Sequence, residues 1–496
     1  RVRLGEALAT VSNESQPLEK VATRNLDALR AYSLAIRSTV IGEVEESLHL
    51  LENAVRLDGG FARARIALAG KYFNLDRGSD ARVQLQAALA EPTRLTMRDR
   101  MIAEAWQANL ESPKAALVKW NALANLYPDL FMAQGTHGYY AWQFANDYAA
   151  AIASTERSAV AQNPHRGLSL YLLGTLRIGV GDYARAHHDF NEARAHGVRY
   201  ENRYHAVLFA AQRDYARTRE VLAAGRPSGS ASDASLGVLF ELAFAFDRAQ
   251  WSMASERIEA ARAQASLRRG DVLDSLDLAL DALAAASGQR VESIERYLAG
   301  RVEPAPDASL THVAEHDGRI LFNAWLAARQ GAPALARRTM AQASAVTRSG
   351  NHPMLARALA VVEAQLALTD GRPDAAIAQL RPLLDGSEPY MTHIVLMDAF
   401  AAAGDSAAAR EQARWLAGHR GRAYVEVGAG TVWIPHNVAH SVLALLAEAG
   451  HSIGLGDREG ARAALEAFRA AWPDHGGSAA LRERAAVLDA ALRAGP

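Results

Sequence analysis

Glycine, small and large apolar positions along this chain recur with the spacing of paired helices. In the segment Gly-Asp-Tyr-Ala-Arg-Ala at 181–186, a glycine is followed five residues later by a small residue. A large apolar residue comes four positions after the small one, on the same face of a helix. The pattern predicts a turn at the glycine and a close helix crossing at the small residue. The large apolar residues are Leu51, Leu85, Trp120, Phe190, Leu222, Ile258 and Leu465. The fourth unit has Thr155 and Ser158 instead, so we expect looser packing there.

The small residues mark twelve positions, and their spacing indicates the kind of repeat. The first six intervals are 34, 35, 35, 35, 32 and 36 residues, and the later ones are 39, 43, 40, 33 and 52. The tetratricopeptide repeat, a helix–turn–helix unit, has a period of about 34 residues. The sequence therefore predicts an all-α fold, a right-handed α-solenoid of about twelve tetratricopeptide-like helix pairs. The twelve anchor positions are Ser47, Ala81, Ala116, Ala151, Ala186, Thr218, Ala254, Ser293, Ala336, Ala376, Ala409 and Ala461.

The regularity of this spacing divides the chain into five parts. Residues 1–22 are expected to be an N-terminal lead-in or linker, and residues 23–225 a regular array of six pairs. Residues 226–233 are rich in glycine and serine, which predicts a flexible joint. Residues 234–475 are expected to form six more divergent pairs. Residues 478–494 show an amphipathic pattern and are expected to form the capping helix that a solenoid needs at its end.

The 52-residue interval exceeds one period by about 18 residues. The candidate insertion is 420–435. Two β-prone runs, Tyr424–Val427 and Thr431–Trp433, flank the glycine-rich stretch Gly428–Gly430. This arrangement indicates a β-hairpin. An irregular loop is the alternative.

The charge balance of the chain bears on its partners. Of its 496 residues, 54 are Lys or Arg and 55 are Asp or Glu. Binding to a nucleic-acid backbone depends on a surplus of clustered positive charge, so we do not expect a nucleic-acid partner. Only four of the basic residues are lysines, which favours a bacterial source with a GC-rich genome.

The absence of cysteine and of long apolar runs excludes further classes of protein and of site. Without cysteine there is no disulfide framework, thiol nucleophile or thiolate metal site. No apolar run reaches the 18 or so residues that span a bilayer, so we expect no direct membrane insertion in this segment. The chain begins at Arg1 without methionine, which suggests a fragment or a processed form. We expect a periplasmic location if a membrane segment precedes Arg1, and a cytoplasmic one otherwise.

Four segments resemble a known group of proteins. They are Arg3–Leu8, Leu18–Ser33, His419–Glu426 and Pro435–Ala439. Together they are similar to the C-terminal tetratricopeptide region of bacterial signalling proteins that carry an N-terminal cyclase-like or Ser/Thr kinase domain. Among these, the chain is most similar to the peptide modification system cyclase proteins. The resemblance implies a regulatory, sensory or scaffolding arm, and it implies no catalytic residue within this segment.

One short motif could carry chemistry. His312, Glu315 and His316 match H-x-x-E-H, a zinc-peptidase pattern that also needs a distant third ligand. Neither Glu363 nor Glu388 is a convincing partner, so a polar helix start is the favoured interpretation and a metal-dependent hydrolase a distant alternative. His187-His188 are expected on a solvated helix face, since adjacent helical residues point about 100° apart. The eight tryptophans are expected to pack in the core.

The first helix of each pair should line the concave face of the solenoid. The position fifteen residues before successive anchors holds Tyr32, Ile66, Met101, Thr136 and Tyr171. With neighbouring positions, this predicts a peptide- or protein-binding site made of Tyr32, Phe73, Asn74, Asn109, Tyr140, Gln143 and Tyr171. The four aromatic residues would hold the side chains of the peptide, and the amides would bind its backbone. We expect an extended peptide with apolar side chains. A carboxylate clamp is not expected, because the groove looks aromatic and amide-rich rather than basic.

The sequence thus predicts a non-catalytic scaffold that binds a protein or peptide segment and needs no cofactor or metal. A structural spacer or oligomerisation module is the alternative. For the groove itself, the alternative is that neighbouring turns of the superhelix fill it.

Overall fold

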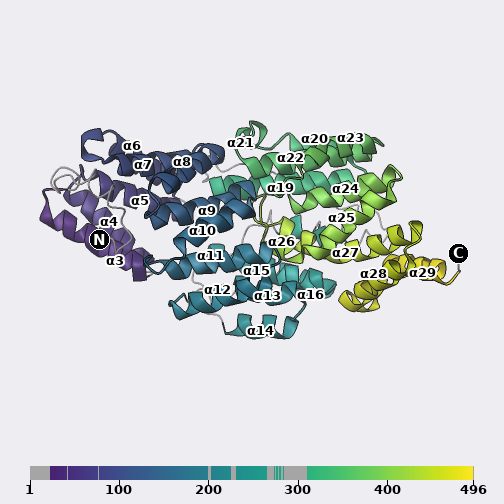
Figure 1. Ribbon diagram of the computed structural model, residues 1–496. Helices are drawn as coiled ribbons and strands as arrows, with labels where there is room; N and C mark the ends of the chain where they lie inside the picture. The colour runs from purple at the N-terminus through teal and green to yellow at the C-terminus, as the bar shows by residue number, and fades with distance from the viewer. Residues whose placement is uncertain are drawn as a thin grey trace.

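The computed structural model describes residues 23–41, 43–75, 77–198, 203–224, 231–264, 273, 275–277, 279–280, 283 and 310–494. Within these residues the chain is helical and contains no strand, and most of its helices form antiparallel pairs (Figure 1). This confirms the predicted all-α solenoid. None of the described helices combines the length and the apolar character needed to cross a bilayer. The predicted lead-in, residues 1–22, lies outside the described residues.

Six helix pairs follow one another in the first half of the chain, and in each pair the two helices pack against each other. The pairs are α3 (Leu26–Ile41) with α4 (Val44–Leu57), α5 (Ala62–Asn74) with α6 (Gly78–Leu89), α7 (Met97–Asn109) with α8 (Pro113–Leu126), α9 (Phe131–Ala145) with α10 (Tyr148–Ser158), α11 (Arg166–Gly179) with α12 (Tyr183–Ala195), and α13 (Arg203–Ala211) with α14 (Tyr215–Ala223). A 3-10 turn, η2 (Pro92–Arg94), precedes α7.

The second half continues the series with longer and less regular units. They are α15 (Ala231–Asp247) with α16 (Trp251–Ala263), α19 (Leu310–Arg329) with α20 (Pro333–Met340), α22 (Pro353–Thr369) with α23 (Pro373–Leu380), α24 (Tyr390–Ala402) with α25 (Ser406–Gly418), and α27 (Trp433–Gly454) with α28 (Arg458–Ala471). Short helices α21 (Ala345–Arg348), η4 (Arg381–Leu383), α26 (Arg420–Val425) and η5 (Pro473–Gly477) connect them. Helix α29 (Ala479–Arg493) closes the array by burying Leu481, Ala485 and Leu492.

The predicted anchor residues occupy the same position in every described helix pair. Each of the eleven anchors within the described residues is the fourth residue of the second helix of its pair, and each is at most 3% exposed. The twelfth, Ser293, lies outside the described residues. A small side chain at this position lets the two helices of a pair approach closely. The shared position and burial of these residues therefore confirm the predicted repeat register. Among the tryptophans, Trp120, Trp142, Trp325, Trp433 and Trp472 are buried, as expected.

The turn before the second helix takes the left-handed conformation that the glycines predict. Gly181 has φ +76°, and the next residue, Asp182, caps α12 by accepting a hydrogen bond from the Arg185 amide. Three turns without glycine have the same conformation, with φ of 57° at Asn146, 63° at Arg213 and 52° at Ala249. Such a conformation costs a residue with a side chain about 1 kcal/mol or more, so the packing of the flanking helices imposes it.

The fourth pair is packed closely rather than loosely, which corrects the expectation for Thr155 and Ser158. Both residues are at most 1% exposed. They face Gly138 and Gly135 of α9, and a Cβ on Gly138 would lie 2.2 Å from Thr155 Oγ1. Glycine on one helix thus compensates for the small polar residues on the other, and α9 approaches α10 more closely than a larger side chain would allow.

The segment 420–435 forms no hairpin, and it is no exposed loop either. It begins with α26, continues through buried residues 426–430 and the half-buried Thr431, and enters α27 at Trp433. Figure 1 shows α26 in the middle of the molecule, and it packs against α11 and α13 of the first half. The hairpin prediction fails because the local β propensity of these residues is overridden by their tertiary contacts. Of the expected joint 226–233, residues 226–230 lie outside the described part, and residues 231–233 begin α15.

Candidate peptide-binding groove

A groove of about 460 Å³ lies between the first helices of the first three pairs. Its walls come from α3, α5 and α7, and Leu130 and Met132 at the start of α9 close one end. We call this region the N-terminal groove. It is lined by Tyr32, Ile36, Thr39, Leu51, Arg63, Ile66, Ala67, Gly70, Lys71, Asn74, Arg98, Asp99, Ile102, Trp106, Leu130 and Met132.

Aromatic packing shapes the apolar part of the N-terminal groove. The Tyr32 ring packs against Phe61 of the following pair, with centroids 5.1 Å apart. Trp106 contacts Phe73 and Trp120, each with a centroid distance of 5.3 Å. Its indole fits against Gly70, where a Cβ would lie only 3.2 Å from the ring. The aromatic wall is therefore held by contacts between successive repeats and needs no ligand to keep its shape.

The N-terminal groove also contains positive charge, which the sequence interpretation did not expect. Arg63 Nη2 lies 2.8 Å from Asp99 Oδ2, and Thr96 holds the same carboxylate through a 2.8 Å hydrogen bond. Lys71 forms no ion pair within the described residues, and burial lowers its pKa. Three basic residues, Arg63, Lys71 and Arg98, line the groove together with the carboxylate of Asp99. The groove can neutralise acidic groups of a ligand as well as bury apolar ones.

The predicted site residues separate into two groups according to their place along the solenoid. Tyr32 and Asn74 line the N-terminal groove. Phe73 is 8% exposed and lies beneath Trp106 as part of its support. Asn109 and Tyr140 belong to the core, which corrects their assignment to a ligand surface. Asn109 is fully buried, donates to the Tyr140 hydroxyl at 2.9 Å and accepts from the Trp120 indole at 3.0 Å.

The later predicted residues, Gln143 and Tyr171, are half-buried and lie outside the N-terminal groove. The Gln143 carbonyl packs against Gly428, where a Cβ would lie 2.3 Å from the oxygen. The Tyr171 ring contacts Phe190 at 5.3 Å and Tyr204 at 6.3 Å. Neither residue lines the N-terminal groove, so the predicted continuous surface from the first to the fifth pair ends near α9.

The covering element is the segment 420–432, which packs on the ends of α9, α11 and α13. The Trp142 indole donates to the Val425 carbonyl at 3.0 Å. Gly421 lies so close to α11 that a Cβ would be 2.0 Å from the Ile178 carbonyl oxygen. The Arg420 guanidinium donates to the carbonyls of Ala210 and Ala211 at the end of α13. The chain thus fills this part of its own surface, while no described segment fills the N-terminal groove.

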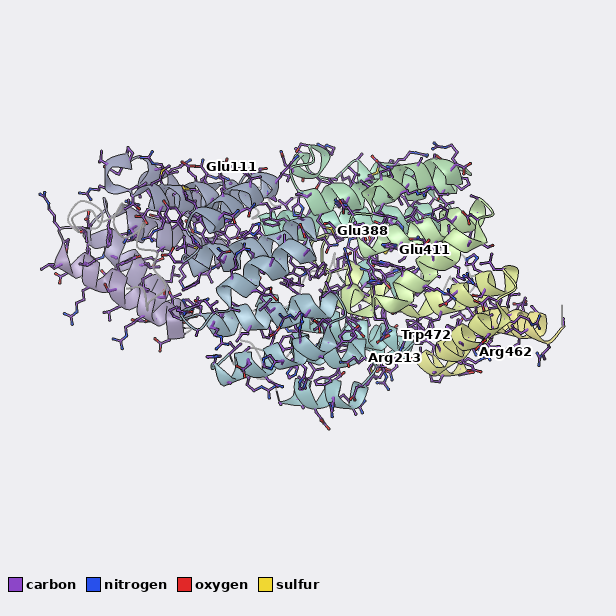
Figure 2. All side chains as sticks on the ribbon, in the orientation of Figure 1. Glu111, Arg213, Glu388, Glu411, Arg462 and Trp472 are labelled. Carbon is purple, nitrogen blue, oxygen red and sulfur yellow. The ribbon has the colours of Figure 1, made fainter. Side chains whose placement is uncertain are left out.

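A buried carboxylate joins the two halves. Asp247 at the end of α15 is fully buried and accepts two hydrogen bonds from Arg420, at 3.0 and 2.8 Å. The hydroxyls of Tyr215 and Tyr424 donate to it at 2.6 and 2.7 Å. Burial alone would raise the pKa of Asp247, but the charge and hydrogen bonds of Arg420 outweigh this and lower it. Figure 2 labels Arg213 and Trp472, which reach the same residue from the two halves, the indole donating to its carbonyl at 3.0 Å.

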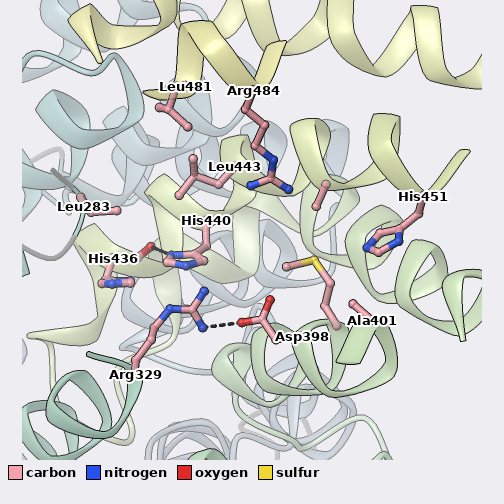
Figure 3. Close-up of a pocket in the computed structure, with 12 residues that line it drawn as sticks. Leu283, Arg329, Asp398, Ala401, His436, His440, Leu443, His451, Leu481 and Arg484 are labelled. Carbon is pink, nitrogen blue, oxygen red and sulfur yellow. Dashed lines mark hydrogen bonds and ion pairs between the residues drawn. The ribbon is translucent and has the colours of Figure 1, made fainter. Parts of the chain in front are cut away.

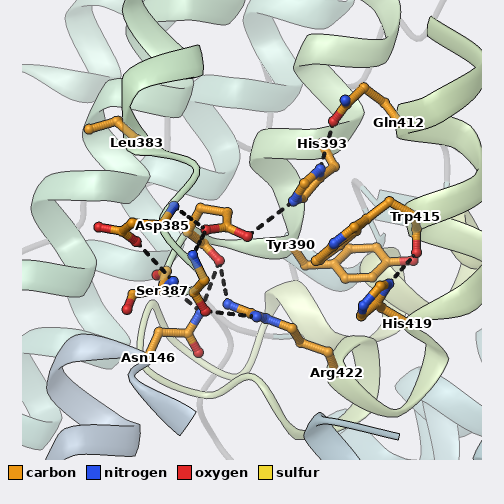
Figure 4. A network of polar contacts seen from close by, with 12 residues as sticks. Asn146, Leu383, Asp385, Ser387, Tyr390, His393, Gln412, Trp415, His419 and Arg422 are labelled. Carbon is orange, nitrogen blue, oxygen red and sulfur yellow. Dashed lines mark hydrogen bonds and ion pairs between the residues drawn. The ribbon is translucent and has the colours of Figure 1, made fainter. Parts of the chain in front are cut away.

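A second buried network lies between the turn after α9 and the α24–α26 region (Figure 4). Asn146 donates to Glu426 Oε2 and to the Glu388 carbonyl, both at 3.0 Å. Arg422 donates to the Glu388 carbonyl at 2.7 Å. The Trp415 ring lies between the imidazoles of His393 and His419, with centroid distances of 3.4 and 4.2 Å. The hydrogen bonds from Asn146 and Arg422 connect the turn after α9 to the α24–α26 region, so the network holds the halves together. In the sequence, only the long interval before Ala461 pointed to this region.

Two residues of the H-x-x-E-H motif, Glu315 and His316, contact other parts of the protein. The Glu315 carboxylate accepts from the Thr431 amide at 3.2 Å and from its hydroxyl at 3.0 Å, and His316 Nδ1 lies 2.9 Å from Asp317 Oδ1. The side chain of His312 lies outside the description. No group of three His, Asp or Glu side chains among the described residues is placed to hold a metal ion. His187 and His188 are exposed, as expected.

No protein-family profile matches this chain. No curated protein matches its sequence. Among solved structures, it is similar to the P58(IPK) TPR domain, at 14% identity over 77% of this chain and 99% of that one, with a TM-score of 0.19. It is also similar to Naa15/Naa10 bound to HypK, at 11% identity over 94% of this chain and 78% of that one, with a TM-score of 0.22. The case for a function therefore rests on the chain's own geometry.

Proposed function

We propose that this chain is a non-catalytic helical-repeat scaffold that binds an extended segment of another protein in the N-terminal groove. The observation that carries the proposal is the combination of a half-buried Lys71 without an ion-pair partner among the described residues and an aromatic wall at Trp106. Removing a lysine from water disfavours its charged form, and a ligand carboxylate would restore that lost stabilisation. The first helices of the fourth to sixth pairs, α9, α11 and α13, are less suited to bind a partner, because the chain's own segment 420–432 already covers their ends. This supports the N-terminal groove as the binding site indirectly.

The dimensions of the groove set the length of the ligand. Packed helices lie 8–10 Å apart, so the three intervals from α3 to α9 span roughly 24–30 Å. An extended chain covers at most about 3.3–3.6 Å per residue. The groove therefore accommodates about eight residues of an extended peptide.

The lining sets the composition of that peptide. Ile66, Ile102 and Trp106 provide the apolar surface, and Asn74 provides an exposed amide that can pair with a peptide backbone. The half-buried Lys71, which forms no ion pair with the described residues, favours an acidic ligand. We thus extend the sequence-based expectation of an apolar peptide to one that alternates apolar residues with Asp or Glu.

The wider role follows from the sequence resemblance. We propose that the chain is the regulatory or sensory arm of a larger bacterial signalling protein, in which the groove recognises a partner for a cyclase-like or kinase domain. The alternative role of a spacer or oligomerisation module predicts no ligand for the groove.

A random eight-residue peptide library displayed on phage tests the site. Selected peptides should combine acidic and apolar residues, and Lys71→Glu should weaken their binding at least tenfold, about 1.4 kcal/mol. Lys114→Glu is the matched control, because Lys114 is exposed on α8 and does not line the groove. Equal binding by both variants would place the site elsewhere. Failure to select any peptide, with self-association in light scattering, would favour the spacer.

A further inference from the structure

A second cavity lies far along the chain from the N-terminal groove. It has a volume of about 220 Å³ and is enclosed by α19, α24, α27 and α29 (Figure 3). Arg329 and Asp398 form an ion pair on one side. Figure 3 shows Arg484 extending from α29 into the space on the opposite side of that pair. We call this region the C-terminal cavity.

Among the described residues that line the C-terminal cavity, the charges do not balance. Two arginines, Arg329 and Arg484, face one carboxylate, Asp398, which leaves a formal surplus of one positive charge. Arg484 forms no ion pair or hydrogen bond with the part of the chain that the structure describes. The guanidinium of Arg484 therefore offers a planar pair of N–H donors. This geometry binds a carboxylate with two parallel hydrogen bonds.

The histidines of the cavity are neutral near pH 7 and add acceptors rather than charge. Burial, together with the positive charge of Arg329, lowers the pKa of His440 to about 3. His440 Nδ1 lies 3.1 Å from the His436 carbonyl oxygen, which can only accept, so the proton is on Nδ1 and Nε2 is an acceptor. His436 is 2% exposed, and its Nδ1 has no hydrogen-bond partner in the described structure. Its pKa is lowered by burial and by His440.

Apart from His451, the remaining walls are apolar, and the cavity is small. Met397, Leu443 and Leu481 line it between the polar groups. At the roughly 30 Å³ that each molecule occupies in liquid water, the volume corresponds to about seven waters. Clefts of this kind, mainly apolar with a few convergent polar groups, are typical of small-molecule sites. The cavity is open to solvent beside Arg484, which is exposed.

We infer that the C-terminal cavity binds a small organic monoanion, a carboxylate on a compact apolar body, with Arg484 pairing the carboxylate and the imidazoles accepting any N–H or O–H of the ligand. One negative charge neutralises the surplus, and Met397, Leu443 and Leu481 contact the apolar part. The site joins the capping helix α29 to α19, α24 and α27, so an occupied cavity also fastens the end of the solenoid. This inference is independent of the N-terminal groove.

Isothermal titration calorimetry of the full chain with acetate, isobutyrate and benzoate tests the site. At least one of these acids should bind saturably, and benzamide, which has the shape of benzoate without its charge, should bind at least tenfold more weakly than benzoate. Arg484→Met should lower the affinity at least tenfold, and Arg484→Lys should lower it less because the charge remains. Arg482→Met is the control on the same helix, since Arg482 is outside the cavity and pairs with Asp474.

Three outcomes would overturn the inference. The first is that none of the three acids binds, or that wild type and Arg484→Met bind equally. The second is that inorganic phosphate binds as tightly as the best acid with the same dependence on Arg484, which would make the ligand an inorganic anion. The third is that a tetrapeptide ending in leucine binds through Arg484 while no small acid does, which would assign the cavity to a protein C-terminus.

Discussion

The close contact between α26 and α11 is the part of the solenoid's packing on itself that a substitution can test most directly. Gly421 and Gly418 are both helical and three residues apart, but their surroundings differ. A Cβ on Gly421 would lie 2.0 Å from the Ile178 carbonyl oxygen, whereas a Cβ on Gly418 has nothing within 4 Å. Real Cβ contacts essentially never fall below 3.0 Å, so Gly421→Ala must move α26 away from α11 by about 1 Å or more.

The magnitude follows from comparing the two variants. Alanine in place of glycine stabilises a helix by roughly 0.5–1 kcal/mol, and this gain applies to both positions. Overpacking a close contact costs about 1–3 kcal/mol, and this cost applies to Gly421→Ala alone. Gly421→Ala should therefore be less stable than Gly418→Ala by about 1–3 kcal/mol. The loss should be concentrated where α26 contacts the first half, including the hydrogen bond from Arg420 to the Ala211 carbonyl.

Hydrogen exchange measured by mass spectrometry locates the effect. Peptides covering 420–426 should exchange roughly 5- to 150-fold faster in Gly421→Ala, because each 1.4 kcal/mol of local stability changes exchange about tenfold. Peptides covering α5 and α6 provide the internal control and should be unchanged. Equal exchange of 420–426 in the two variants would refute the close packing of α26 on α11, and with it the conclusion that the chain fills part of its own surface.

Two further predictions concern the repeat core and the buried carboxylates. Ala186→Leu should destabilise the chain by about 1–3 kcal/mol in urea denaturation, because Ala186 is fully buried at its helix crossing. Ala184→Leu, on the exposed face of α12, is the control and should change the stability little. Equal urea midpoints for the two variants would count against the repeat register. Burial opposes the ionised form of Glu388, but the hydrogen bond with His393 and the Arg422 charge prevail and lower its pKa from 4.5 to about 2. Its ionised form therefore stabilises the fold above pH 4.5, by at most about 3 kcal/mol, and this contribution is lost as the pH falls from 4.5 toward 2. Wild type minus Glu388→Gln should show that loss in denaturation curves, and a pH-independent difference would refute it.

The repeat architecture could be predicted because its determinants are local. Ala186 must be small since the two helices of its own pair cross there, and Gly181 and Asp182 end one helix and begin the next within a few residues. Such features recur at each unit and can be counted in the sequence. Arg213 and Ala249 mark the limit of this reasoning, since their turns are left-handed without glycine and only the flanking helices impose that conformation.

The candidate site could be predicted only in part, because equivalent repeat positions meet different neighbours. Asn74 and Asn109 both lie seven residues before an anchor, yet Asn74 is exposed in the N-terminal groove and Asn109 is buried between Tyr140 and Trp120. The pairing of Lys71 with the aromatic wall also escaped the sequence interpretation, which weighed aromatic and amide positions and not the basic ones between them.

What the sequence determined by itself is therefore the helix pair and its register, because these depend on residues close together in the chain. Only the tertiary structure decided which part of the first-helix surface stays open. Small rotations between successive pairs accumulate along a solenoid until distant segments meet, and here they bring Arg420 against Asp247, 173 residues away in sequence. No local pattern encodes that meeting. It covers the surface beyond α9 and leaves the N-terminal groove unfilled by any described segment.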